Sequence, residues 1–411
     1  MNWKSPISFA VLAALTATPM FAAYQEEVDF LRKHTPIVEL GSGDCRVAIA
    51  PAWQGRVMTS TATGVGGGSF GWINPPTIEA GIKPEAEREG LAKHIHIFGG
   101  EERLWFGPEG GPFSLFFQPG AKQVFDQWRT PAAIDTEPFE VIGKPSQTEA
   151  VFGRSMELRN RAGTTLAMEV RRTVRLLKPE DVSALCEACL PKNLKMVGYA
   201  TDNRVTNTGK SPWTRETGAP SIWMLGMYKP SPKTTVVIPI EAGGVDKLGK
   251  KVETSYFGEV PADRIKIGEN VVYFKGDGGH RSKIGVPPKR SQGIAGSWSP
   301  DSNTLTLVII GSNLAAQDTG WPYVDSQWRD DVNPFGGDVI NSYNDGAPEP
   351  GAKPLGPFYE LETSSPALLL GPQESFTHTQ ITLHLTGERE ALDSVAVKLL
   401  GVSLNEIEGS L

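Results

Sequence analysis

The sequence predicts an all-β protein, an antiparallel sandwich with few short helices. Turn-forming residues are abundant, with 45 Gly and 32 Pro among 411 residues, so many short elements joined by tight turns are expected. Apolar and polar residues alternate in several runs, as in 381–385, where Ile381, Leu383 and Leu385 take one face of a strand. Few stretches with helical periodicity separate these runs, which argues against a doubly wound α/β fold.

Two helices are expected, one near each end of the chain. The first spans 24–34 and ends before Pro36, with Val28 and Leu31 on one side. The second spans 387–401 and ends at a glycine that suits a helix C-terminus. Its apolar stripe consists of Ala391, Leu392, Val395 and Leu399, and its first turn carries Glu388 and Glu390.

Hairpins are expected at three places between these helices. Residues 46–61 form a strand, a turn at 51–55 and a second strand. Residues 154–177 turn at 160–163, where a glycine can adopt a positive φ. Residues 297–311 turn at 300–303. The Gly-rich stretch 64–71 is not followed by a helical pattern, so it is interpreted as a connection and not as a phosphate-binding loop.

The first 23 residues have the form of a secretory signal peptide. Lys4 precedes a mostly apolar run from Ile7 to Leu15, and the segment ends in Ala22 and Ala23. We therefore expect a periplasmic or secreted protein whose mature part, 24–411, is one β-sandwich domain. No other stretch approaches the roughly 20 apolar residues that a membrane-spanning helix needs, so no membrane span is expected.

The charge of the chain argues against nucleic-acid binding. The formal net charge is −7, and the 40 Lys and Arg residues are dispersed along the sequence. Three cysteines occur, Cys45 alone and Cys186 with Cys189 in a Cys-Glu-Ala-Cys run. In an oxidising compartment that pair is either a local disulfide or two ordinary thiols.

Carboxylates and imidazoles line up in the stretch 357–385. Alternate side chains of a strand share a face, so Glu360 and Glu362 point the same way, roughly 6–7 Å apart. Downstream, one face of the last strand carries His378, Gln380, Thr382 and His384. Such faces suggest a polar binding surface, although the two histidines of the last strand are interpreted as structural.

Residues 94–109 form a second polar segment. His94 and His96 are expected on one face of a strand, followed by a turn at 99–100. Arg103 and Trp105 then share a face of the next strand, and Glu109 lies in a Gly-Pro-Glu-Gly-Gly loop. Aromatic rings pack on the C–H faces of sugars while charged groups bind their hydroxyls, so this segment suits a saccharide ligand.

Two metal sites are considered. The first combines His94 and His96 with a carboxylate such as Glu109 or Glu362. The second is the oxygen-rich stretch 325–345, which suits Ca²⁺ although the EF-hand spacing is absent. In the alternative, Asn341, Tyr343 and Asp345 contact the ligand directly. No other cofactor is expected.

The run Leu361-Glu362-Thr363, followed by Gly371-Pro-Gln-Glu374, resembles the last strands of galactose mutarotases (aldose 1-epimerases). A strand ending in Thr206-Asn207 is similar to another strand of that family. The resemblance implies a β-supersandwich, sugar binding, and Glu362 as the general base. It also implies an acid histidine after the Thr-Asn pair, but Thr208 stands there.

The sequence therefore predicts an exported saccharide-binding protein of the mutarotase-like class, with sugar epimerisation as its candidate reaction. Glu362 is the expected base and His96 the candidate acid, with His280 as another. The expected binding groups are Arg103, Trp105, Glu109, Glu360 and Asp345.

Three alternatives stay open. The first is a saccharide-binding module without catalysis. The second is a glycoside hydrolase, which needs two carboxylates flanking a bond, here Glu109 and Glu362. The third is a lyase that would use Tyr343 or Tyr359 beside Arg103.

Overall fold

The strands form three antiparallel sheets. The computed structural model describes residues 23–185, 191, 193–311, 320–348 and 351–411. The strands are β1 (Val38–Ser42), β2 (Cys45–Ala50), β3 (Arg56–Thr61), β4 (Arg103–Gly107), β5 (Glu140–Val141), β6 (Glu149–Arg159), β7 (Thr165–Leu176), β8 (Leu194–Asn207), β9 (Ser221–Tyr228), β10 (Thr235–Pro239), β11 (Ile265–Ile267), β12 (Val271–Lys275), β13 (Ser282–Val286), β14 (Ile294–Ser299), β15 (Thr304–Ile310), β16 (Ile340–Asn344), β17 (Tyr359–Ser364) and β18 (Ser375–Gly387). The helices are α1 (Tyr24–His34), α2 (Pro75–Ala80), α3 (Ala132–Asp135), α4 (Pro179–Leu185), α5 (Val245–Leu248), α6 (Arg389–Leu400) and α7 (Leu404–Glu408).

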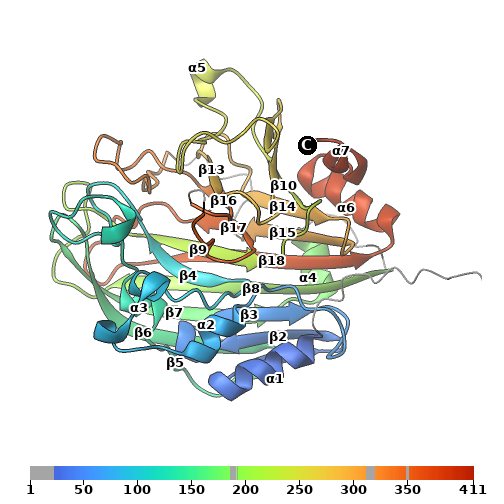
Figure 1. Cartoon of the computed structure of the whole chain (residues 1–411), viewed down its shortest axis with the longest axis horizontal. Coiled ribbons are helices and arrows are strands. Elements are labelled where there is room, and N and C mark those ends of the chain that lie inside the picture. The colour runs from blue at the N-terminus through green and yellow to red at the C-terminus, as the bar shows by residue number, and fades with distance from the viewer. Residues whose placement is uncertain (1–22, 186–190, 192, 312–319, 349–350) are drawn as a thin grey trace, which may run out of the picture.

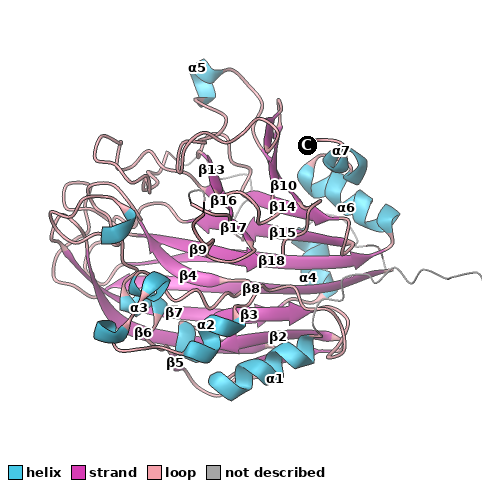
Figure 2. Ribbon diagram, viewed as in Figure 1, coloured by secondary structure: helices cyan, strands magenta, loops and turns pink. Residues whose placement is uncertain are grey.

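Strands occupy the middle of the molecule and the short helices lie at its periphery (Figure 2). The largest sheet has ten strands in the order β11-β12-β10-β14-β15-β18-β8-β7-β6-β5. A five-stranded sheet has the order β13-β16-β17-β9-β4, and a three-stranded sheet the order β1-β2-β3. An antiparallel bridge between Val57 and Glu102 joins the two smaller sheets. The prediction of an all-β protein with few short helices is confirmed.

The smaller sheets cover one face of the large sheet, which gives a two-layer sandwich (Figure 1). Thr363 of β17 lies at the contact between layers, where its hydroxyl donates to Gln380 Oε1 at 2.7 Å and lies 2.8 Å from His378 Nε2. The polar face of β18 that contains these two residues is therefore buried between the layers. His378 and Gln380 are bonded within the protein, which agrees with the structural interpretation of His378, whereas the same face borders a cavity at Thr386 near the other end of β18.

Helices α6 and α7 cover the opposite face of the large sheet. Leu305 and Leu307 of β15 pack there against Leu392 and Leu400 of α6 in one apolar cluster. The next side chains of β15 point to the other layer, so this strand is buried on both faces. Gly401 ends α6 in a left-handed conformation with φ 73°, which satisfies the expected C-terminal signal.

The expected helices and hairpins are present. Helix α1 has the expected bounds, 24–34, and α6 falls within 387–401. The three hairpins are β2–β3, β6–β7 and β14–β15. No helix in the described part of the chain is long and apolar enough to cross a membrane. The expected signal peptide and the Cys186–Cys189 pair lie outside the described residues, apart from Ala23.

The strand expected at His94 and His96 is absent. The chain leaves a short 3₁₀ helix, Gly90–Lys93, and runs as a loop to Gly99. The backbone N–H of His96 donates to the carboxylate of Asp135 at 3.0 Å, and that of His94 donates to the Leu91 carbonyl. These bonds take the place of a strand ladder, so the prediction that both imidazoles share a sheet face is wrong.

Candidate functional site

The candidate site is built on the face of the five-stranded sheet that points away from the large sheet. Partner residues of antiparallel strands share a face, and Glu362 is paired with Asn341 on β16 and Leu225 on β9. Leu225 is in turn paired with Arg103 on β4. The register thus places Glu362 and Arg103 on the same face, as the strand periodicity predicts for Glu360 and Glu362.

Glu362 is fully buried and held through one of its oxygens. Lys283 Nζ and Trp223 Nε1 both donate to Oε2, each at 2.8 Å. The ammonium also lies 4.6 Å from the centre of the Trp223 ring, a cation–π distance. Oε1 has no hydrogen-bond partner among the described residues. A buried acceptor without a donor is costly, so Oε1 is the atom that a ligand or water donor would satisfy.

Glu360 lies two residues earlier on the same strand and is paired with Arg103. Arg103 Nη2 donates to Glu360 Oε1 at 2.5 Å, and both side chains are buried. Burial raises the pKa of Glu360 to about 7, and the charge of Glu362 acts in the same direction, although Arg103 and Lys283 oppose both. Arg103 also stacks over the Trp105 ring at 4.4 Å, so the predicted binding residues Arg103, Trp105 and Glu360 form one contiguous group.

Glu109 comes to this face from the loop after β4. Its backbone N–H donates to Ser326 Oγ at 3.1 Å, which ties the loop to 325–332. Burial raises the pKa of the Glu109 carboxyl above its ordinary value, and the charge of Glu362 adds to the increase, while Lys283 and Arg281 offset part of it. Glu109 therefore lies within electrostatic reach of Glu362, which the sequence alone did not establish.

An aromatic cluster continues from Glu362 along the same face. Trp105 lies edge-on to Trp223 with ring centres 5.7 Å apart, and Phe116 lies 5.3 Å from Trp105. Phe116 then stacks on Trp128 at 5.8 Å, and Trp128 on Trp328 at 5.9 Å. The indole N–H groups of Trp105 and Trp128 are buried and have no acceptor in the described part of the chain. The cluster thus combines apolar rings with free donors.

Asp345 and Asn341 lie at the β16 side of the same face. Tyr343 Oη donates to Asp345 Oδ1 at 2.8 Å, and the Gly356 N–H donates to Oδ2 at 2.8 Å. Burial raises the pKa of Asp345 to about 6. Asn341 Nδ2 donates to the Tyr256 hydroxyl at 3.1 Å, so its amide is already engaged. The charge of Asp345 helps to raise the pKa of Glu360. Both oxygens of Asp345 already accept hydrogen bonds, from Tyr343 and Gly356.

His96 lies apart from the carboxylates. Its Nδ1 lies 2.8 Å from Asp135 Oδ2, and its buried Nε2 has no partner among the described residues. The ring borders a cavity of about 300 Å³ together with Asn74, Thr77 and Leu355. Among the described residues, His96 contacts Asp135 and does not contact Glu362. The structure therefore does not bring the predicted acid to the predicted base. His280 has no recorded side-chain contact there with Glu362 either.

Neither proposed metal site is assembled. In the ranges that the structure describes, no group of three or more His, Cys, Asp or Glu side chains is arranged to hold an ion. Within 325–345, Asp325 accepts from the Gln327 N–H, and Asp338 accepts from the Tyr256 hydroxyl at 2.5 Å. Local hydrogen bonds therefore use these oxygens.

Several residues of the site were missed at the sequence level. The signal for Lys283 was that it is the one charged residue of the buried strand Ser282–Val286, next to Ile284 on the opposite face. That signal becomes clear only once the strand is known to be buried. Trp223 lies in a run that is apolar on both faces, so alternation could not single it out. Trp128 and Trp328 come from loops without a regular pattern.

This arrangement suits proton transfer on a polyhydroxylated ligand. Glu362 has one oxygen without a partner among the described residues and a fixed ammonium at the other, and burial raises the pKa of a second carboxyl, that of Glu109. Aromatic rings and unpaired N–H donors surround them. A base and an acid in one buried site are the groups that general acid–base catalysis needs.

The fold can be compared with solved structures. Slr1438 from Synechocystis sp. PCC 6803 is 14% identical, with 86% of this chain and 96% of that chain covered at a TM-score of 0.46. A galactose mutarotase-like protein from Lactobacillus casei ATCC 334 is 11% identical, with 85% and 100% covered at 0.43. A galactose mutarotase related enzyme from Lactobacillus acidophilus is 9% identical, with 86% and 97% covered at 0.43.

No curated protein matches the chain. A family model matches almost its whole length. Because the model described as a family of unknown function, DUF6786, matches residues 22–411, the chain belongs to that family.

Proposed function

We propose that the Glu362 face binds a saccharide and interconverts its anomers, as an aldose 1-epimerase does. The observation that carries the proposal is the pair of buried carboxyls with different surroundings. Glu362 accepts from Lys283 and Trp223 and keeps Oε1 free. Glu109 has a pKa raised by burial. Two carboxyl groups in different surroundings are a common basis of acid–base assignments.

The proposed reaction moves two protons and breaks one ring bond. Glu362 Oε1 takes the proton of the anomeric hydroxyl while Glu109 gives its proton to the ring oxygen. The bond between the anomeric carbon and the ring oxygen then breaks, which leaves an open-chain aldehyde. Rotation about the neighbouring C–C bond exposes the other face of the aldehyde. On reclosure Glu109 takes its proton back from the hydroxyl that attacks the aldehyde, and Glu362 gives its proton to the new anomeric oxygen.

The surrounding side chains fit this role. The rings of Trp105 and Trp223 are each 4% exposed in this structure and lie beside the carboxyls, where sugar C–H groups would pack on them and the Trp105 N–H, unpaired among the described residues, would donate to a hydroxyl. Arg103 and Glu360, held together at 2.5 Å, supply further polar contacts. Glu109 replaces His96 as the proposed acid because it is electrostatically coupled to Glu362, and because Glu360, which is also coupled to Glu362, is held in an ion pair by Arg103.

Export to the periplasm or the medium remains part of the proposal. Its support is the lysine, apolar run and terminal alanines in 1–23. Edman or mass-spectrometric determination of the mature N-terminus tests it, and the expected first residue is Tyr24.

NMR exchange spectroscopy on free aldoses tests the proposed reaction. Wild-type protein should accelerate exchange between the anomers of at least one sugar in a panel. Glu362→Gln and Glu109→Gln should each lower that rate, by about 10²- to 10⁴-fold for loss of a proton-transferring group. The matched control is Glu157→Gln on the exposed face of β6. Ligand shifts without faster exchange would identify a binding module, and cleavage of a polysaccharide would identify a hydrolase or lyase.

A further inference from the structure

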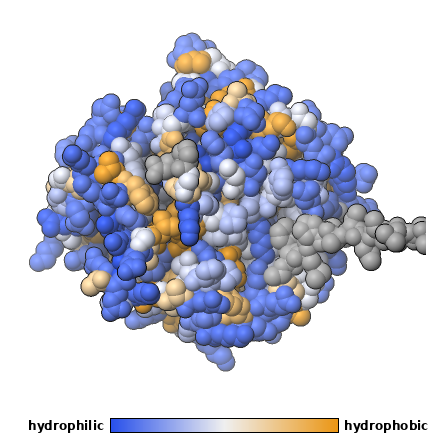
Figure 3. Space-filling view, in the orientation of Figure 1, coloured by the Kyte–Doolittle hydropathy of each residue, from blue (hydrophilic) through white to orange (hydrophobic). Residues whose placement is uncertain are grey.

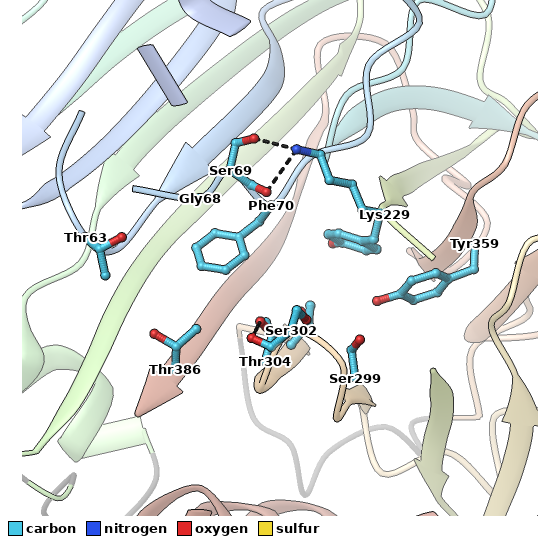
Figure 4. Close-up of a pocket in the computed structure, with 12 residues that line it drawn as sticks. Thr63, Gly68, Ser69, Phe70, Lys229, Ser299, Ser302, Thr304, Tyr359 and Thr386 are labelled. Atoms are coloured by element: carbon cyan, nitrogen blue, oxygen red, sulfur yellow. Dashed lines mark hydrogen bonds between the residues drawn. The ribbon is translucent and has the colours of Figure 1, made fainter. Parts of the chain in front are cut away.

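A second polar cavity lies between the two layers at one end of the sandwich, on the opposite face of the five-stranded sheet from Glu362. Its volume is about 230 Å³, several times the ~30 Å³ that one water molecule occupies in the liquid. Tyr359 of β17 and Tyr228 of β9 form part of its wall, and the loop with Gly68 and Phe70 closes one side (Figure 4).

Hydroxyl groups fill sheet positions that normally carry apolar side chains. Ser299, Thr304 and Thr386 are cross-strand partners on β14, β15 and β18, so their side chains form one row on the inner face. Thr306 lies in the next row, 2.9 Å from His384 Nδ1. The row after that carries Ala295 and Val308, together with Thr382 on β18, whose hydroxyl donates to Glu102 Oε2 at 3.2 Å. The hydroxyls of the first two rows therefore border the cavity, whereas the hydroxyl of Thr382 is bonded within the protein.

The charged side chain in the cavity wall, Lys229, already has an ion-pair partner within the protein. Among the described residues that line the cavity, only Lys229 carries a charge. Its ammonium donates to Glu27 Oε1 at 2.7 Å and to both the carbonyl and the hydroxyl of Ser69. Figure 4 shows the two bonds to Ser69. An anionic ligand would have to compete with Glu27 for this ammonium. A neutral ligand needs only the hydroxyls. Several of these are bonded within the protein, as Thr304 is to the Ser302 carbonyl, but a hydroxyl oxygen has two lone pairs and can still accept from a ligand.

The cavity is open at one end and buried at the other. Thr63 and Gly68 are exposed at the mouth, whereas Thr306 and Tyr359 are only 4% and 3% exposed at the base. The face of the molecule seen in Figure 3 is mainly hydrophilic, with apolar residues in separate patches. The Phe70 ring stacks on His384 at 4.4 Å, which fixes an aromatic surface beside the hydroxyls.

We infer that this cavity binds a neutral polyol the size of one sugar ring, independently of the Glu362 site. Hydroxyl-lined walls beside aromatic rings match the two surfaces of such a ligand, its O–H groups and its C–H faces. The volume lies below the roughly 300–1,000 Å³ usual for drug-sized ligands, which favours one ring over an oligosaccharide.

Saturation-transfer NMR with myo-inositol tests this inference, because myo-inositol is a neutral ring polyol without an anomeric centre and cannot be a substrate for epimerisation. Wild type and Glu362→Gln should give equal signals. Thr386→Trp, which places a large side chain at the cavity, should abolish the signal. Thr304→Val should weaken binding about five- to tenfold, as expected for loss of one hydrogen bond. The matched control is Thr165→Val, an exposed position on β7.

Each outcome of this NMR experiment supports or overturns the inference. No signal with wild-type protein would overturn the inference, as would a signal that survives both Thr386→Trp and Thr304→Val. Loss of the signal in Glu362→Gln would assign the binding to the other site. A stronger signal from glucuronate than from myo-inositol would overturn the neutral character of the ligand. If Thr386→Trp does not fold, as judged by circular dichroism, Ser302→Trp replaces it, since Ser302 also lines the cavity.

Discussion

Lys283 Nζ donates to Glu362 Oε2 at 2.8 Å, a buried ion pair between β13 and β17 that spans the intervening strand β16. Both side chains are almost wholly buried, so neither charge is compensated by water. The pair fixes which oxygen of Glu362 faces protein donors and which one is left for a ligand.

Lys283→Met should destabilise the protein by about 3–5 kcal/mol, because it leaves the Glu362 carboxylate buried without its counter-charge. Glu362→Gln combined with Lys283→Met should recover part of this loss, since no unpaired charge then remains. Urea unfolding of wild type, both single variants and the double variant measures the coupling. Strictly additive losses would show that the two side chains do not interact.

Glu109→Gln should remove the alkaline limb of the pH–rate profile. A general acid works only when protonated, and burial raises the pKa of Glu109. Activity of the wild type should therefore fall as the pH rises through that pKa. Glutamine cannot give a proton, so the variant should be slow at every pH. Steady-state rates of anomer exchange across pH 5–9 supply the test, and an unchanged alkaline limb in Glu109→Gln would assign the acid to another group.

Gly110→Ala should disturb the site without touching a polar group. A Cβ at Gly110 would lie 2.2 Å from the backbone oxygen of Gln327, so the loop with Glu109 and the loop with Trp328 would have to separate. We expect about 1–3 kcal/mol of destabilisation, in the range for overpacking, and at least a tenfold loss of sugar affinity. Gly66→Ala is the matched control, because nothing lies within 4 Å of its Cβ position. If thermal unfolding and ligand titration gave the same results for Gly110→Ala and Gly66→Ala, the close packing of Gly110 against the Gln327 backbone would be refuted.

His378→Gln should flatten the pH dependence of stability between about pH 6.5 and pH 4. Burial lowers the pKa of His378 from 6.5 to about 4, so within this window the unfolded chain binds a proton that the folded protein does not. Folding stability due to His378 is therefore present above pH 6.5 and lost as the pH falls, up to about 3 kcal/mol in all. Urea unfolding of both proteins at several pH values shows the difference. The raised pKa values of Glu360 and Asp338 act in the opposite direction, but they cancel in the comparison. Parallel curves would mean that His378 keeps its ordinary pKa in the fold.

Much of the secondary structure follows from local patterns. Helix 24–34 and the turn at 160–163 are specified by apolar spacing, proline and glycine within a few residues, and the structure has them where expected. The segment around His96 shows the limit of that reasoning. Its alternation suits a strand, but none of the described strands pairs with it, and the Asp135 carboxylate accepts from the backbone N–H of His96 instead.

The residues around Glu362 could be predicted only in part, because the alternation of polar and apolar residues along a strand does not show which strands become neighbours. Glu360, Glu362, Arg103 and Trp105 were expected to face a ligand, and strand register does bring them to one face. Lys283 meets Glu362 only because β16 lies between their strands, and that order arises from pairing between segments far apart in the sequence. The loops that bring in Glu109 and Trp328 follow no periodic pattern.

A crystal structure of the protein soaked with a free aldose tests the central claim most directly. The account predicts a sugar ring against Trp105 and Trp223, with its anomeric oxygen within hydrogen-bond distance of Glu362 Oε1 and its ring oxygen facing Glu109. Density for the sugar only in the hydroxyl-lined cavity at Thr304, with Glu362 Oε1 contacted by water alone, would contradict it.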